Sequence, residues 1–204
     1  MAFVETVTLP GQHATLEPLS PAHEDDIKLA VADGELWELW FTTVPRPEGV
    51  RDYIEQLLLQ RERGEAFAFA VRDNQSGKIV GGTRYLHIDG ANRRLEIGGT
   101  WYAQRMQRTA INTECKLLLL AHAFETLRCI AVEFRTDWFN KRSQAAIERL
   151  GAKRDGVLRN HMIMPDGRIR DTVVYSLIQN EWAGVKKNLQ HKLEAGGLGP
   201  VITC

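Results

Sequence analysis

Apolar and polar residues repeat with two distinct periods along this chain, and the two periods predict its strands and helices. Period-two alternation predicts strands at residues 13–19, 66–73, 79–88, 94–102 and 129–136, and a closing hairpin built from residues 157–164 and 171–178. Helical spacing predicts two short helices within residues 21–40 and longer ones at residues 49–63, 111–127, 140–150 and 181–193. Residues 195–204 have neither period and predict a loose tail.

The order of these elements predicts an α+β fold, with a mixed, mostly antiparallel sheet flanked by helices. Turns at residues 74–78 and 89–93 join three strands into an antiparallel meander, and the strand–helix–strand segment at 94–136 allows a parallel pair. Where neighbouring strands diverge, a cleft opens at their ends, and such places collect ligands. We expect one domain over residues 1–180, followed by a helix and tail over residues 181–204.

Charge, cysteine spacing and hydropathy each exclude a class of binding partner. The 204 residues include 26 Lys and Arg and 26 Asp and Glu, so the formal net charge is zero and no nucleic-acid partner is expected. The three cysteines have no spacing typical of a metal site, and we expect no metal. The sequence has no signal-peptide pattern and no apolar run long enough to cross a bilayer, so we expect a cytoplasmic protein with no membrane partner.

A basic loop before the helix at 111–127 changes the picture given by the net charge. The first N–H groups of a helix have no partner within it, and the helix dipole makes them attractive to phosphate. Thr109 and Ala110 are small, and Arg105 and Arg108 add positive charge beside them. The loop is therefore a candidate pyrophosphate site, although an ordinary helix start capped by Thr109 or Asn112 gives the same pattern.

Several blocks of the sequence together resemble the GCN5-related N-acetyltransferases (GNAT) and, within them, the RimJ/RimL-like branch. The family pattern at this helix start is Gln/Arg-x-x-Gly-x-Gly/Ala, and the chain has Ala110 at the first glycine and Asn112 at the second small position. The other matching blocks, in family order, are residues 95–101, 123–127, 140–143, 147–152, 155–159, 166–168 and 171–177. The resemblance covers residues 14–180.

The resemblance implies transfer of an acetyl or other short acyl group from acyl-coenzyme A to an amine. It implies a GNAT-like sheet that splays between the strands at 94–102 and 129–136, with the pantetheine arm of acetyl-CoA in the splay. The residues implied to bind the donor are Trp101, Tyr102, Gln107, Arg108, Thr109, Ala110, Ile111, Asn112, Thr113, Asn140 and Arg142.

Glu96 is the candidate catalytic base. Period-two alternation places it on the face shared by Gly98 and Thr100, and a carboxylate in a dry cleft has a raised pKa that suits it to accept a proton from an amine. The alternative is a solvent-side glutamate paired with Arg93 or Arg84.

Ser143 is the candidate acid that protonates the leaving thiolate, because the resemblance places it near the sulfur. The alternative is a first-turn serine that satisfies backbone N–H groups, with a water relay supplying the proton.

Other polar and aromatic residues are candidates for the cleft or for ordinary packing. His87, His161 and Tyr175 suit either a cleft or a half-buried strand. Four aromatic residues could form the wall of an acceptor pocket or pack in the core, namely Trp37, Trp40, Phe41 and Trp138. Asp171 could hold a substrate ammonium group or pair with Arg168 or Arg170, and Cys115 and Cys129 are typical of buried small hydrophobic residues.

Two other functions remain open beside the enzyme. One is a non-catalytic acyl-CoA sensor, which the unusual Ala110 and Asn112 favour, and the other is an interaction domain whose basic loop binds nothing. If the protein is an enzyme, the acceptor is the amine of a protein N-terminus or of a small molecule. The last helix or an exposed strand edge could support a homodimer.

Overall fold

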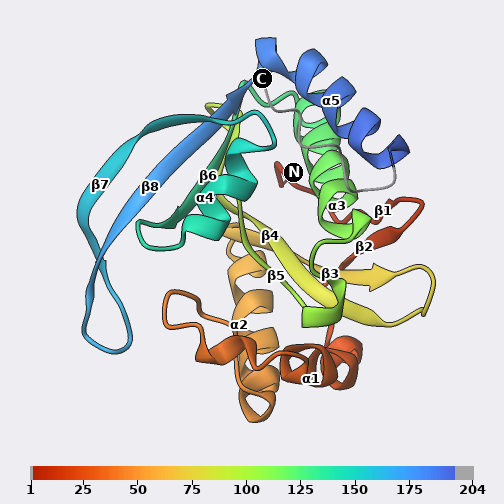
Figure 1. Cartoon of the computed structure of the whole chain (residues 1–204), viewed down its shortest axis with the longest axis vertical. Coiled ribbons are helices and arrows are strands. Elements are labelled where there is room, and N and C mark those ends of the chain that lie inside the picture. The colour runs from red at the N-terminus through yellow and green to blue at the C-terminus, as the bar shows by residue number, and fades with distance from the viewer. Residues whose placement is uncertain (1, 196–204) are drawn as a thin grey trace.

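The computed structural model describes residues 2–195, so almost all of the predicted tail lies outside the described residues. Within that range one eight-stranded sheet runs in the order β1-β2-β3-β4-β5-β6-β8-β7 (Figure 1). Its strands are β1 Leu9–Pro10, β2 Ala14–Pro18, β3 Ala66–Asp73, β4 Ile79–Asp89, β5 Arg94–Tyr102, β6 Ala131–Asp137, β7 Lys153–Ile163 and β8 Ile169–Ile178. The helices in the same range are α1 Glu24–Ala32, α2 Val50–Glu62, α3 Ala110–Ala121, α4 Lys141–Glu148 and α5 Trp182–Glu194, with short 3₁₀ turns between elements.

The predicted α+β fold with a mostly antiparallel sheet is confirmed. The strands β3, β4 and β5 form the antiparallel meander, and β5 pairs in parallel with β6. In β3, Phe67, Phe69 and Val71 face one apolar cluster, and Ala68 and Ala70 face the other. Because both faces of this strand are covered, it is almost continuously apolar.

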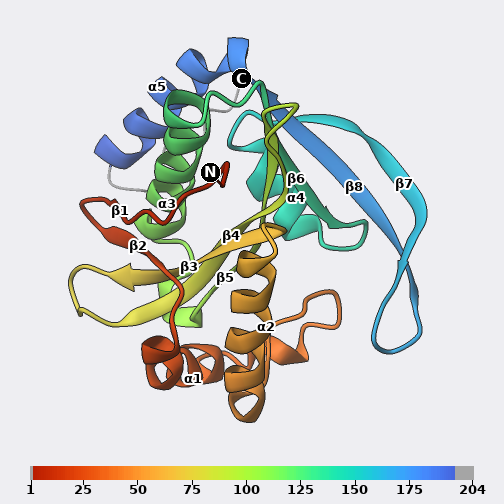
Figure 2. The ribbon, with the colours of Figure 1, turned by 180° about the vertical axis from the view of Figure 1, so that it is seen from behind.

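The sheet separates two helical layers. The larger core packs one face against α3 and α5, and the smaller core packs the other face against α1 and α2 (Figure 2). Trp182, Val185 and Leu189 place α5 in the larger core, beside α3. The long β7–β8 hairpin sweeps away from both layers (Figure 1).

The strands β5 and β6 stay together for only a few residues. Arg94–Glu96 pair with Ala131–Glu133, and from Ile97 onward β5 has no partner on that side. The strand β6 continues to Asp137, paired with β8. The result is the splay that the resemblance implies.

A bulge in β5 corrects the expected alternation around Glu96. Gly99 has a φ of +55°, and the β4–β5 register shifts between Gly82 and Arg84. Glycine accepts this left-handed backbone without the steric penalty of a side chain. Glu96 therefore shares a face with Gly98, whereas Thr100 turns toward α3, where Lys116 donates to its hydroxyl.

The element boundaries differ from the expected ones at a few points. The sequence analysis missed β1, which has two residues. The predicted helix at 111–127 stays α-helical only to Ala121 and then widens into a π-helical turn over His122–Thr126. Ile130, expected inside a strand, precedes β6 and is exposed. The helix predicted over 140–150 ends two residues earlier, at Glu148 with Arg149 as its C-cap, and Gly151 then turns the chain with a φ of +100°. No helix within residues 2–195 is long and apolar enough to span a bilayer.

Candidate active site

The loop between β5 and α3 presents a capped helix start beside the splay. The Thr109 hydroxyl accepts a hydrogen bond from the Ile111 amide at 3.4 Å and donates one to the Met106 carbonyl at 2.8 Å. Arg108 adopts a left-handed backbone with φ of +63°, which turns the chain into the helix. Thr109 is thus the N-cap, one of the two residues expected there. The other first-turn amides, including that of Asn112, have no partner within the helix.

The cations around this loop are distributed differently from the expectation. Arg105 forms an ion pair with Asp33 at 2.6 Å, so Asp33 offsets the positive charge that Arg105 brings to the loop. Arg108 is exposed at the helix start. Arg142, from α4, donates to the Gln107 side chain at 2.9 Å and so joins the start of α4 to the loop. The Gln107 amide in turn reaches the Tyr102 carbonyl at 3.4 Å.

Trp101 and Tyr102 both have buried side chains at the end of β5. The indole N–H of Trp101 donates to the Tyr53 hydroxyl at 3.4 Å, and the Tyr102 ring lies in the larger core. Burial raises the pKa of Tyr102 well above its usual value. Both side chains therefore belong to the cores, and the backbone edge of these two residues borders the splay.

The start of α4 faces the same splay from β6. Asn140 is the N-cap, and its side-chain oxygen accepts a hydrogen bond from the Ser143 amide at 3.0 Å. The Ser143 side chain is half-buried in the first turn. Because Asn140 already satisfies the Ser143 backbone, the Ser143 hydroxyl is not needed as a cap.

Glu96 lies buried at the point where β5 and β6 separate. Its carboxylate, 6% exposed, accepts a hydrogen bond from His87 at 2.8 Å and lies 3.4 Å from the Arg135 guanidinium. Burial raises the pKa of Glu96, although His87 and Arg135 oppose the shift. The expected alternative partners, Arg93 and Arg84, are replaced by these two residues. His87 is 63% exposed and connects the buried carboxylate to solvent.

Lys116 is a buried residue that the sequence analysis did not single out. Its ammonium group donates to the Thr100 hydroxyl at 2.7 Å, and Thr100 lies 2.8 Å from the hydroxyl of Thr83. Burial lowers the pKa of Lys116 to about 8. The available signal was a single lysine inside the apolar run of α3, which is easily taken for a solvated residue.

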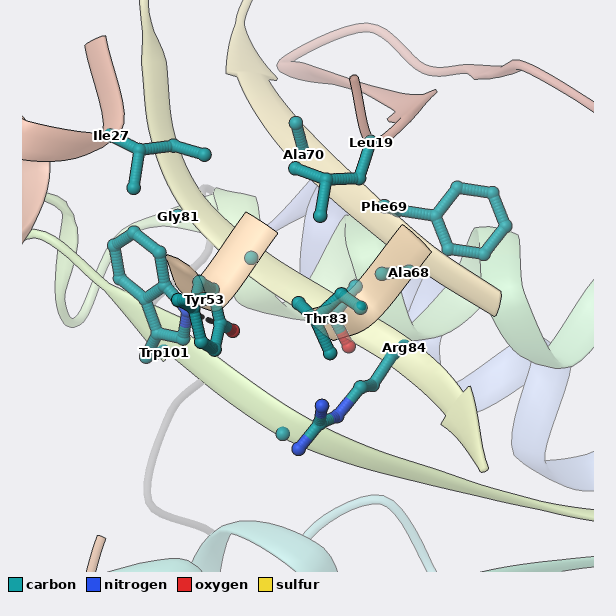
Figure 3. Close-up of a pocket in the computed structure, with 13 residues that line it drawn as sticks. Leu19, Ile27, Tyr53, Ala68, Phe69, Ala70, Gly81, Thr83, Arg84 and Trp101 are labelled. Carbon is teal, nitrogen blue, oxygen red and sulfur yellow. Dashed lines mark hydrogen bonds between the residues drawn. The ribbon is translucent and has the colours of Figure 1, made fainter. Parts of the chain in front are cut away.

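A narrow pocket lies between α2 and the bulged ends of β4 and β5 (Figure 3). It measures about 10 Å³, which is room for about one water molecule. Figure 3 shows Tyr53 against Trp101 at one end and Arg84 at the other. Gly99 lies so close to the Arg84 guanidinium that a side chain at this position would collide with it.

Of the four aromatic candidates, three are at least partly buried and one, Trp40, is exposed. Trp37 and Trp138 are partly buried against the two cores. Trp40 is 51% exposed, packs edge-on against Phe41, and contacts Phe139 at 5.8 Å between ring centroids. Phe139, which the sequence analysis missed, thus connects the α1–α2 loop to the start of α4.

The remaining candidates have structural partners. Tyr175 is fully buried, not half-buried as expected, and its hydroxyl donates to Glu148 at 2.9 Å. Asp171 pairs with Arg159 at 2.5 Å, which corrects the expected pairing with Arg168 or Arg170. His161 lies 3.1 Å from the Thr172 hydroxyl.

The two cysteines within the described range behave as buried hydrophobic residues. Burial raises the pKa of the Cys115 thiol to about 12 and that of the Cys129 thiol to about 11. Residues 2–195 contain no group of three His, Cys, Asp or Glu residues arranged to hold a metal ion.

Comparisons with known proteins agree with this geometry. The family model described as an acetyltransferase (GNAT) domain matches residues 13–153. YdaF of Bacillus subtilis strain 168, provisionally named a ribosomal N-acetyltransferase, is 26% identical over 179 residues, which are 86% of this chain and 97% of that protein. A solved structure of a provisionally named acetyltransferase from T. thermophilus is 35% identical, with a TM-score of 0.81, and the match covers 93% of this chain and 98% of that one.

A more distant structure adds a ligand-bound example of the fold. The microcin C7 self-immunity acetyltransferase MccE, solved in complex with acetyl-CoA and AMP, is 21% identical, with a TM-score of 0.72. The match covers 82% of this chain and 93% of MccE. At this identity the likeness shows the fold alone.

Proposed function

Because the chain belongs to the GNAT acetyltransferase family, whose domain model matches residues 13–153, we propose that it transfers an acetyl or short acyl group from acyl-CoA directly to a primary amine. The observation that carries the proposal is the buried carboxylate of Glu96 at the point where β5 and β6 separate. The acetyl-CoA bound in the MccE structure supports the choice of donor. The acceptor is an amine of a protein N-terminus or a small molecule, and the name of YdaF supports the first class.

The donor is proposed to lie along the unpaired edge of β5. Its pantetheine arm contacts the backbone of Trp101 and Tyr102, and Asn140 and Arg142 approach it from α4. Its pyrophosphate accepts hydrogen bonds from the loop and first turn of α3, where the dipole favours negative charge. The residues of this phosphate site are Gln107, Arg108, Thr109, Ala110, Ile111, Asn112 and Thr113.

In the proposed reaction the neutral amine nitrogen attacks the thioester carbonyl, and the carbon–sulfur bond then breaks. Glu96 takes the proton that the amine loses, directly or through one water, because its raised pKa makes it a better base than an exposed carboxylate. Protonated Glu96 then donates to Nδ1 of the His87 tautomer that carries its hydrogen on Nε2, and His87 passes the proton to solvent. Ser143, or a water held by it, gives a proton to the thiolate that leaves.

The test measures thiol release from acetyl-CoA across a panel of amines. Glu96→Gln keeps the size of the side chain but removes its basicity, so we expect turnover to fall by about 10²–10⁴-fold with acetyl-CoA affinity nearly unchanged. We expect Ser143→Ala to lower turnover less, since water can replace a weak acid. Because protonation disables the base, wild-type turnover should fall as the pH drops through the raised pKa of Glu96.

Glu17→Gln is the matched control. Glu17 is a strand glutamate with the same kinds of partner, Arg72 at 2.6 Å and His23 at 3.2 Å, but it lies on β2, away from the splay. We expect this variant to keep full turnover. Full activity in Glu96→Gln would refute the assigned base. Acetyl-CoA binding without thiol release for any amine would favour the sensor function instead.

A further inference from the structure

A group of arginines lies on the face of the sheet that carries Glu96, beyond the part that α1 and α2 cover. The register places Glu133 opposite Glu96, and alternation along β6 adds Arg135 and Asp137 to the same face. On β8, Thr172 lies opposite Asp137, so Arg170 shares this face too. Because α1 and α2 pack against β3 and β4, this part of the face lies between them and the β7–β8 hairpin (Figure 1).

The guanidinium groups on this face have more hydrogen-bond donors than the nearby carboxylates satisfy. Arg168 lies 2.8 Å from Asp137, and Arg170 lies 3.9 Å from the same oxygen, too far for a hydrogen bond. Arg135 divides its contacts between Glu133 at 2.9 Å and Glu96 at 3.4 Å. Among residues 2–195, the buried Nε atoms of all three arginines lack a hydrogen-bond partner.

Unpaired buried donors are costly, and three in one place need an explanation. Each gives up its hydrogen bond to water on burial without gaining another acceptor in exchange. Arg170 is only 16% exposed, and burial lowers the pKa of its guanidinium. The planar guanidinium fork matches carboxylate and phosphate oxygens, so a bound anion would supply the missing acceptors.

The arginines also adjoin the proposed chemistry. Arg135 contacts Glu96 itself, and Asp137 directly precedes the loop to Asn140. On the outer side, the Arg168 guanidinium lies 4.5 Å from the centre of the Trp40 ring, so the exposed rings of Trp40 and Phe139 lie at the rim of the arginine group. An anion held here would keep an amine on the same molecule close to Glu96.

We propose that Arg135, Arg168 and Arg170 form the acceptor subsite and that the acceptor is a small amine carrying an anionic group, a carboxylate or a phosphate. This proposal rests on the proposed transferase function and names the substrate class for the same site. A Lys- and Arg-rich protein N-terminus would bring further cations toward three clustered guanidinium groups, and the site therefore disfavours it.

The experiment compares matched pairs of amines in the thiol-release assay. The pairs are α-amino acids against their own α-carboxamides, and phosphoethanolamine against ethanolamine. For one of the two kinds of pair, we expect kcat/KM to be at least about tenfold higher for the anionic member than for the neutral one. The kind of pair that shows this preference identifies the anion as carboxylate or phosphate. Arg170→Gln should remove most of that preference, because it lowers kcat/KM for the anionic member more than for the neutral one.

Arg159→Gln is the control, because it removes the same charge from the same hairpin. Arg159 pairs with Asp171 on the opposite face of β8 and should not affect the preference. The proposal would be overturned if the enzyme preferred the neutral members or a basic peptide N-terminus. It would also be overturned if Arg170→Gln lowered kcat/KM equally for both members of a pair.

A binding titration tests the anion subsite without requiring turnover. N-acetylated amino acids and N-acetylated phosphoethanolamine are titrated separately into the protein saturated with coenzyme A, and the Kd of each is measured. We expect binding that weakens about tenfold or more in Arg170→Gln and stays unchanged in Arg159→Gln. If no amine is turned over, the proposed function fails, and this titration still decides the anion subsite. No binding of any anionic probe to the wild-type protein refutes the subsite.

Discussion

Lys116 is a buried ammonium group that the fold retains at an energetic cost. Its pKa of about 8 in the folded state compares with 10.5 for a solvated lysine, so between these values the unfolded chain binds more protons. The free energy of unfolding should therefore rise with pH from about 8 to 10.5, by up to about 3 kcal/mol. Below pH 8 both states are protonated and the whole penalty remains.

Lys116→Met should remove this penalty. We expect the free energy of unfolding near neutral pH to increase by about 1–3 kcal/mol, since the lost hydrogen bond to Thr100 offsets about 1 kcal/mol. We also expect its rise above pH 8 to disappear. Urea unfolding at several pH values measures both effects, and the exposed Lys153→Met serves as the control. If the free energy of unfolding rose equally with pH above 8 in the wild type and in Lys116→Met, the prediction would be wrong.

At the scale of single residues, the sequence predicts the location of a side chain more reliably than it predicts the partner with which that side chain pairs. Glu96 was found because alternation in a strand is local, and its raised pKa agrees with the expectation. Its partners His87 and Arg135 were not found, because the first depends on a left-handed backbone and the second on a parallel neighbour distant in sequence. Asp171 was assigned the wrong arginine for the same reason, since its partner comes from the adjacent strand.

At the scale of elements, the N-terminus of α3 is the proposed site for the pyrophosphate of the donor. Ala110 is the first helical residue, next to the Thr109 cap. An aspartate there stabilises the helix through the dipole but places a negative charge against the pyrophosphate. Ala110→Asp should therefore weaken acetyl-CoA binding by about 10–100-fold without lowering the stability of the fold.

Titration calorimetry with acetyl-CoA tests this prediction, and Ala110→Asn is the neutral control of similar size. The difference between the two variants should shrink as salt is added, because the repulsion is electrostatic and partly solvated. Unchanged affinity in Ala110→Asp would remove the phosphate site from this helix start.

The strands β3 and β5 follow the predicted boundaries to the residue, because their apolar period and flanking turns are both local signals. The helix α3 is shorter than its apolar run predicts. The Tyr85 hydroxyl donates to the Leu119 carbonyl at 2.7 Å, one turn before the helix widens, and this contact crosses from β4. The bulge at Gly99 likewise depends on how β4 and β5 meet and not on composition.

At the scale of the whole molecule, a net charge of zero conceals a strongly uneven arrangement. Arg105 and Asp33 offset one another, whereas Arg168 and Arg170 share the single carboxylate of Asp137. Neutrality in the sequence could exclude a broad basic surface but could not reveal this local surplus of donors. The surplus appears only when the hairpin folds back beside β6.

Because of the splay, the half of the sheet that ends at β5 is joined to the half that begins at β6 by a short stretch of strand pairing. We therefore expect acetyl-CoA binding to change the hydrogen exchange and the stability of the protein. Among residues 2–195, the strand pairing of β5 with β6 involves only Arg94–Glu96 of β5, so a donor lying between the strands would supply hydrogen bonds to the unpaired part of β5. We expect hydrogen exchange to slow at the amides of residues 97–102 when acetyl-CoA binds, with little change at the tip of the β7–β8 hairpin. At a hundredfold excess over Kd, binding should add about 2.7 kcal/mol to stability. At the same concentration Ala110→Asp, with its roughly 10–100-fold weaker affinity, should show both effects reduced, with only about 0.4–1.4 kcal/mol added to stability. Protection confined to other segments would contradict a donor in the splay.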